Sequence, residues 1–121
     1  MPLTGTCHCG AVTVEVAAKP RSITECNCSI CYRYGARWAH YTRATARIAC
    51  APDAVAAYVW GDRTIEFYHC SSCGCVTHYE SVEKSPDSRI SVNVRIMPPT
   101  EMAEVPVRKF DGADTWTFLQ E

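Results

Sequence analysis

Nine cysteines in a chain of 121 residues constrain this sequence more than any other feature. Eight of them fall into three short clusters, and only Cys50 stands alone. Cysteines two or three residues apart can direct their sulfur atoms at one ion, and clusters far apart in sequence can complete each other's tetrahedral coordination. The spacing therefore favours zinc binding by the clusters Cys7-x-Cys9, Cys26-x-Cys28-x-x-Cys31 and Cys70-x-x-Cys73-x-Cys75.

The middle cluster supplies three thiolates from one short loop, which leaves a fourth zinc position for another ligand. Such an open position is typical of a reactive zinc rather than a purely structural one. The alternative for a small cysteine-rich chain is a disulfide scaffold. The N-terminal residues 1–7 lack the basic and apolar regions of an export signal. We therefore expect a cytoplasmic protein with reduced cysteines, and the odd cysteine count also argues against complete pairing.

The charge balance argues against nucleic acid as a partner. The chain has 12 basic and 13 acidic side chains, whereas nucleic-acid-binding proteins usually carry a clear basic excess. No stretch approaches the ~18 apolar residues of a membrane span, so we expect no membrane partner. One group of arginines follows the cysteine triplet, either as solvated surface or as an anion-binding patch beside the metal that meets a substrate carboxylate. These are Arg33, Arg37, Arg43 and Arg47.

Short β-branched or alternating segments separated by turn residues predict a mainly β fold with short turns of helix. Pro98, Pro99 and Pro106 predict irregular structure between Ile96 and Val107, apart from a short helical turn at 99–103. The sequence contains no repeat and no long linker, so we expect a single domain over residues 1–121. The expected strands are 11–16, 23–26, 36–41, 46–50, 55–60, 64–70, 76–80 and 90–94.

Three motifs resemble the glutathione-dependent formaldehyde-activating enzyme family, whose members share an Mss4-like β fold with two zinc sites. The motifs are Gly5-Thr6-Cys7-His8-Cys9-Gly10-Ala11-Val12, Cys26-Asn27-Cys28-Ser29-Ile30-Cys31 and Cys70-Ser71-Ser72-Cys73-Gly74. The resemblance runs from Thr4 to about Gly112 and includes the segment from Pro106 to Arg108. It predicts a zinc-stabilised, Mss4-like β-sheet domain.

The resemblance implies two ligand sets. Cys7, Cys9, Cys70 and Cys73 are similar to the ligands of the structural zinc. Cys26, Cys28 and Cys31 are similar to the ligands of the catalytic zinc. Coordination deprotonates a thiol, so an open three-thiolate site suits a small thiolate nucleophile beside an aldehyde. The implied activity is that of a carbon–sulfur lyase that reversibly joins a thiol such as glutathione to an aldehyde such as formaldehyde.

Cys75 is an addition to the family motif and has three interpretations: a buried small residue, the fourth ligand of the second zinc, or a substrate-linked thiol. We expect Cys50 to lie in the core. His8 is expected to point away from the metal, and His69 and His78 are either structural or surface histidines or proton relays close to the sulfurs.

Residues around the triplet are candidates for the pocket. Asn27 can supply an amide to the thiolates or to a substrate. Tyr32, Tyr34 and Trp38 either wall the pocket or belong to the core. The apolar segment 116–119 is expected to pack on the domain or on a neighbour, and the oligomeric state is left open. Two further functions stay possible at this stage: a zinc-stabilised protein-binding module, and a redox or metal sensor that uses Cys75.

Overall fold

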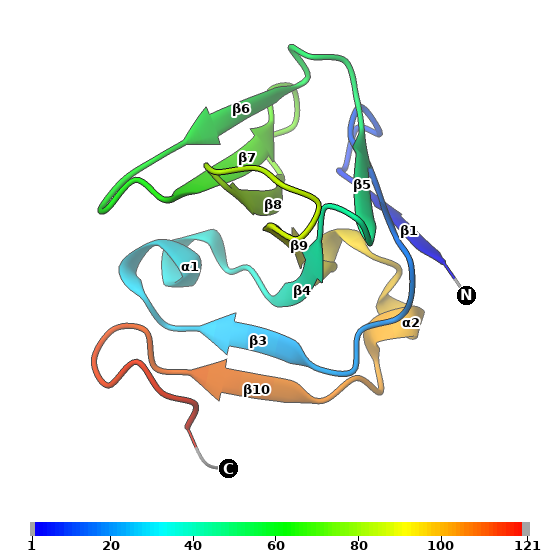
Figure 1. Ribbon diagram of the computed structural model, residues 1–121. Helices are drawn as coiled ribbons and strands as arrows, with labels where there is room; N and C mark the ends of the chain where they lie inside the picture. Colours follow the sequence, from blue (N-terminus) through cyan, green and yellow to red (C-terminus); the bar gives the residue numbers. More distant parts are fainter. Residues whose placement is uncertain (1, 120–121) are drawn as a thin grey trace.

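A computed structural model describes residues 2–119 and places strands and short helices along this range (Figure 1). The strands are β1 (Leu3–Thr6), β2 (Thr13–Val16), β3 (Ile23–Cys26), β4 (Trp38–Thr42), β5 (Ala46–Ala49), β6 (Val55–Tyr58), β7 (Ile65–Cys70), β8 (Val76–Ser81), β9 (Arg89–Asn93) and β10 (Val107–Phe110). The helices are α1 (Ser29–Tyr34), the 3-10 turn η1 (Val94–Ile96) and α2 (Pro99–Met102).

The strands form two sheets. A three-stranded sheet has the order β1-β2-β5, and a seven-stranded sheet has the order β10-β3-β4-β9-β8-β7-β6. All pairings between named strands are antiparallel except that of β10 with β3, which is parallel and sets Lys109 opposite Glu25. Figure 1 shows β10 beside β3, with α1 and the C-terminal segment at the same end of these strands. The predicted mainly β fold with short turns of helix is confirmed.

The main core lies between the two sheets. In β2 the side chains alternate, so Val14 and Val16 are buried while Glu15 is exposed, as the two-residue period of a strand requires. They pack in one cluster with Ile90 and Val92 of β9, a central strand of the larger sheet. A second cluster, which includes Cys31, Trp38 and Phe67, lies around the cysteine triplet.

The predicted strands are found, with shifted ends. The strand expected at 11–16 begins at Thr13, the one expected at 36–41 spans Trp38–Thr42, and the one expected at 55–60 ends at Tyr58. The helical turn expected at 99–103 is α2, which begins with Pro99, a residue that fits the first helical position because its missing N–H is not needed there. The strand expected at 90–94 spans 89–93, and the chain then turns into η1.

Candidate metal centres

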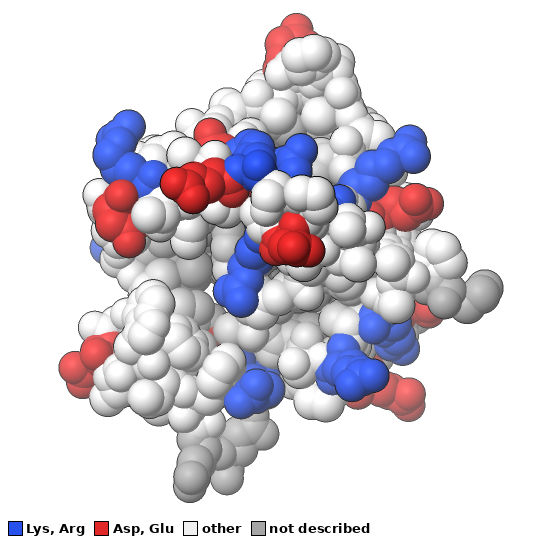
Figure 2. Space-filling view, in the orientation of Figure 1, with Lys and Arg blue, Asp and Glu red and all other residues white. Residues whose placement is uncertain are grey.

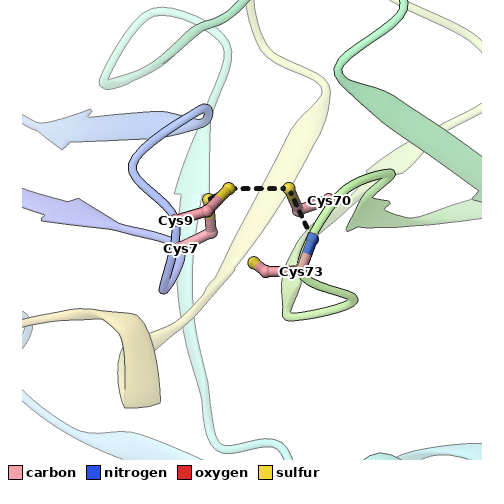
Figure 3. A group of neighbouring side chains, drawn as sticks. All are labelled: Cys7, Cys9, Cys70 and Cys73. Carbon is pink, nitrogen blue, oxygen red and sulfur yellow. Dashed lines mark hydrogen bonds between the residues drawn. The ribbon is translucent and has the colours of Figure 1, made fainter.

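The first cysteine centre joins two distant hairpins. Cys7 and Cys9 lie in the connection between β1 and β2, Cys70 ends β7, and Cys73 lies in the turn that follows. Their four Sγ atoms lie within 4.8 Å of one another. Figure 3 shows the two pairs facing each other, with Cys9 Sγ 3.5 Å from Cys70 Sγ across 61 residues of sequence. We call this group the four-cysteine centre.

The distances in the four-cysteine centre fit zinc. The Sγ atoms of Cys7 and Cys9 are 3.7 Å apart, and those of Cys9 and Cys70 are 3.5 Å apart. Four sulfurs at about 2.3 Å from a tetrahedral zinc lie about 3.8 Å from one another. All nine cysteines of the chain are free rather than paired in disulfides. The residues present therefore suit a four-thiolate metal site.

Backbone N–H groups favour thiolates at this centre. Cys70 Sγ accepts hydrogen bonds from the backbone N–H of Ser72 and of Cys73, both at 3.4 Å. Both bonds lower the pKa of the Cys70 thiol, and the bond from Cys73 has the larger effect. Hydrogen bonds from the backbone of Cys75 and Cys9 lower the pKa of Cys73 to about 5. A metal binds thiolates rather than thiols, so the turn around Cys73 favours the ligand form.

The second centre is built on one short loop and the helix that follows. Cys26 ends β3, Cys28 is the N-cap residue of α1, and Cys31 lies on the buried side of α1. Their Sγ atoms also lie within 4.8 Å of one another. Gly35 ends α1 in the left-handed conformation at φ 64°, which glycine adopts without strain. We call this group the three-cysteine centre.

The donors around the three-cysteine centre also suit thiolate ligands. The backbone N–H of Cys28 donates to Cys26 Sγ, and the indole N–H of Trp38 donates to Cys31 Sγ, both at 3.4 Å. Burial raises the pKa of Cys31 and of Cys26. Burial alone also raises the pKa of Cys28, but hydrogen bonds from the backbone and thiol of Cys31 outweigh it and lower this pKa. A cation is needed to hold all three as thiolates, which is what a zinc ion provides.

The C-terminal segment forms one wall of the three-cysteine centre. A Cβ atom added at Gly112 would lie 2.7 Å from Cys26 Sγ and 3.2 Å from Cys28 Cβ, so only a glycine allows this close approach. Asn27 holds the segment, because its side chain donates to Asp111 Oδ1 and accepts from the Ala113 N–H, each at 3.0 Å. Asn27 thus binds the segment rather than the thiolates. No sequence motif predicts this wall, because it depends on contacts between residues more than 80 positions apart.

A cavity of about 370 Å³ lies beside the three-cysteine centre, and both Cys26 and Cys31 line it. Tyr32 lines this cavity and is 73% exposed. Trp38 is buried against Cys31, and the ring of Tyr34 lies 5.8 Å from that of Phe67. Of the three aromatic candidates, Tyr32 is therefore a pocket residue, Trp38 a core residue in contact with a cysteine, and Tyr34 a packing residue.

The structure excludes one of the three interpretations of Cys75 and contradicts the prediction for Cys50. Cys75 packs with Cys73 against the buried cluster of Cys7, Val12 and Cys70, so it does not complete the three-cysteine centre as a fourth ligand. Its side chain is half-buried, beside the four-cysteine centre. Cys50 is exposed and not in the core, because the chain turns out of β5 directly before it.

None of the three candidate histidines belongs to either ligand group among residues 2–119. His8 is exposed, and His69 is half-buried on β7. His78 is buried and stacks on Tyr68 at 4.6 Å between ring centroids, and its ring nitrogens contact Thr77 and Glu80. Its partners mark His78 as a structural histidine.

The four arginines after the triplet do not form one patch. Arg43 bonds to Glu80 at 2.7 Å, and Arg43 and Arg47 line a different cavity from the one beside the triplet. Arg37 lines the cavity beside the triplet, whereas Arg33 bonds to the backbone of its own helix. Figure 2 shows basic and acidic side chains interspersed on the face that it presents. These residues are close in sequence, but the fold separates them, because Arg43 follows β4 of the seven-stranded sheet and Arg47 lies on β5 of the three-stranded sheet.

The fold and the two centres define a class: a mainly β protein with two cysteine clusters arranged as metal ligands. None of the helices among residues 2–119 has the length and apolar character needed to cross a membrane. The family model for the glutathione-dependent formaldehyde-activating enzyme matches residues 2–105, and the chain belongs to this family. Membership implies carbon–sulfur lyase chemistry as a general class. The family model therefore ends before β10 and Gly112, whereas the sequence motifs predicted that the resemblance reaches about Gly112.

A solved structure supports the same fold. A crystal structure of a Rhodobacter sphaeroides protein is similar to this chain at 33% sequence identity with a TM-score of 0.69. The similarity covers 88% of this chain and 99% of that chain. At this identity and coverage the two chains share their architecture over nearly the whole length of the Rhodobacter protein.

Proposed function

We propose that this protein binds two zinc ions and catalyses the reversible addition of a thiol such as glutathione to an aldehyde such as formaldehyde. The four-cysteine centre is the structural site, and the three-cysteine centre is the catalytic site. One observation carries the proposal: the second centre has only three thiolates and opens on a cavity, whereas the first has four. Family membership supports the thiol and aldehyde as the substrate class.

The reaction needs a thiolate, an aldehyde and a proton. Cys26, Cys28 and Cys31 would hold a zinc ion, whose charge would favour the thiolate form of a substrate thiol, with the thiol proton passing to solvent water. The thiolate sulfur then forms a bond to the carbonyl carbon, and the carbonyl π electron pair moves to the oxygen. That oxygen takes a proton to give the hydroxymethyl thioether, and the reverse reaction returns it.

Residues of this chain shape the site for that addition. The N–H groups of Cys28 and Trp38 hold the sulfurs of Cys26 and Cys31 in place. Gly112 brings the C-terminal segment against Cys26, which limits access from that side. Tyr32 lines the cavity, and we assign its hydroxyl to protonate the alkoxide and then to regain a proton from solvent water.

The test combines metal content with rate. Zinc per chain is measured before and after mild treatment with a colorimetric chelator, and the rate of adduct formation is measured above the uncatalysed rate. We expect two zinc ions, one of them readily extracted, and catalysis that depends on the extractable ion. Cys28→Ser should abolish catalysis and retain the fold. Two equally resistant zinc ions and no catalysis with any thiol–aldehyde pair would instead favour a protein-binding module.

A further inference from the structure

The cavity beside the three-cysteine centre contains more positive than negative charge. Arg37, Arg95 and Lys109 line it, together with one acidic side chain, Glu25. Cys26 and Cys31 lie in the same lining, so these charges surround the place where the proposed function puts the substrate thiol. A single ligand in this cavity of about 370 Å³ can therefore contact the charges and the cysteine centre together.

Two of the three cations have no carboxylate partner. Arg37 Nε donates to Glu25 Oε2 at 2.7 Å, so this pair largely cancels. Arg95 Nε donates to the carbonyl oxygen of Gly35 at 2.6 Å, which fixes the side chain at the end of α1. Within residues 2–119, neither Arg95 nor Lys109 forms an ion pair. Both keep donors for an anion in the cavity.

The strand register places Lys109 next to Glu25, on the side opposite to Arg37. β10 runs parallel to β3, and Lys109 pairs with Glu25. Glu25 thus lies between Lys109 on the neighbouring strand and Arg37, its ion-pair partner. Phe110 and Leu119 add an apolar wall to the same cavity. Arg95 and Lys109 come from η1 and β10, more than 60 residues after the triplet, and Lys109 lies beyond the residues that the family match covers.

We propose that Arg95 and Lys109 bind carboxylates of the thiol substrate, so that the enzyme selects thiols that carry carboxylate groups over neutral ones. The inference rests on the proposed function and specifies its substrate class. Two cations without a carboxylate partner match two carboxylates on one ligand, whereas Glu25 is already paired with Arg37. Charge-assisted hydrogen bonds from arginine to a carboxylate are among the strong ones in proteins. Arg95 and Lys109 are thus specificity residues.

A competing role for the two cations is to offset the negative charge of the thiolates. Three thiolates and one zinc ion carry about one net negative charge. If Arg95 and Lys109 served only this charge, their loss would change the reaction of every thiol equally. Carboxylate recognition predicts a loss confined to anionic thiols. The comparison of charged and neutral thiols therefore separates the two roles.

The experiment compares glutathione with its diethyl ester, which keeps the thiol but masks both carboxylates, on the zinc-loaded full chain. We expect kcat/KM for glutathione to exceed that for the ester by about tenfold to hundredfold, as for the loss of charged hydrogen bonds. Arg95→Gln and Lys109→Gln should each raise KM for glutathione about tenfold, with kcat and the ester reaction little changed. Arg95→Lys keeps the charge and should retain most of the preference.

A matched control removes a distant charge, and a binding measurement separates the two proposals. Arg47 is exposed on β5 and lines a different cavity, so Arg47→Gln should leave the preference unchanged. S-methylglutathione cannot react, and its binding is measured by calorimetry. If no thiol is condensed but Arg95→Gln weakens this binding, the proposed function fails and the carboxylate site stands. Equal reaction of glutathione and its ester, with equal losses for both in Arg95→Gln, overturns the carboxylate site and leaves the proposed function.

Discussion

At the scale of single residues, Gly112 decides whether the three-cysteine centre can form as described. Its Cα position leaves 2.7 Å between an added Cβ and Cys26 Sγ, a distance that real Cβ contacts do not reach. The neighbours are the cysteines themselves, which cannot move without changing their distances to a common ion. The constraint at Gly112 is therefore space rather than backbone conformation.

Gly112→Ala should lower zinc occupancy of the three-cysteine centre and leave the four-cysteine centre filled. The added methyl group displaces either the C-terminal segment or the sulfur of Cys26, and both changes open the site. Zinc per chain should fall from about two towards one, and chelator extraction of the remaining labile zinc should be faster. Ala113→Ser, at the exposed next position, serves as the control. Unchanged zinc content and release rate in Gly112→Ala would contradict this interpretation.

Residue spacing predicted the three cysteine clusters, because ligand spacing is local along the chain and zinc chemistry restricts it strongly, whereas the joining of the first cluster with the third was implied by the resemblance to the family. It did not predict Arg95, Lys109 or Gly112, which come to the centre through β10 and η1 and have no motif of their own. Cys75 and Cys50 show the same limit. The sequence leaves three interpretations open for Cys75 and favours a core position for Cys50, but the turns beside these residues decide which way they face.

At the scale of elements, β10 forms one edge of the seven-stranded sheet, next to β3. β10 adds a parallel edge, and the segment after it folds back so that Phe110 forms an isolated bridge with Phe118. The rings of Trp116 and Phe118 lie 5.1 and 5.0 Å from that of Phe110. The expected packing of segment 116–119 on the protein itself is found for Phe118 and Trp116, although Trp116 stays 71% exposed.

Asn27→Ala should free this segment from the three-cysteine centre. The change removes the two hydrogen bonds to Asp111 and Ala113, each worth about 1 kcal/mol in typical cases. We expect faster amide hydrogen exchange in residues 111–119 with little change in the global melting temperature. Ser72→Ala, an exposed substitution at the other centre, is the control. Retained protection of residues 111–119 would show that the aromatic contacts alone hold the segment.

Most strands could be predicted, since alternation and turn residues are local signals. The elements that the sequence did not indicate are β1, α1 and β10. β1 has only four residues and contains Gly5, α1 has six residues that include one cysteine and two tyrosines, and β10 pairs in parallel with a strand more than 80 residues earlier. Such elements depend on tertiary contacts and on the cysteine centres more than on their own propensities.

At the scale of the whole molecule, the four-cysteine centre links the two sheets. Cys7 and Cys9 belong to the connection within the three-stranded sheet, and Cys70 and Cys73 belong to the β7–β8 turn of the larger one. The buried residues beside this centre are few, with Val12 between Cys7 and Cys70. A metal there would join the β1–β2 connection to the β7–β8 turn, next to only a small buried cluster, whereas the three-cysteine centre spans only six residues of sequence.

Cys73→Ser should therefore destabilise the fold far more than Cys28→Ser. Structural zinc contributes about 10–16 kcal/mol in small metal-dependent folds, which is comparable with the whole stability of about 5–15 kcal/mol of a typical domain. We expect the melting temperature of Cys73→Ser to fall by more than about 10 °C, or the variant to be unfolded when purified, as followed by circular dichroism.

Two comparisons complete that experiment. The melting temperature of Cys28→Ser should lie within a few degrees of that of the unsubstituted protein. Cys50→Ser changes an exposed cysteine outside both centres and should leave the melting temperature unchanged. Because the first centre ties the two sheets together, the original protein should unfold in one transition, as the predicted single domain over residues 1–121 requires. A strong chelator should then lower that transition in one step with the loss of the resistant zinc. A folded, zinc-depleted Cys73→Ser protein with an unchanged transition would assign the structural role to side-chain packing instead of the metal.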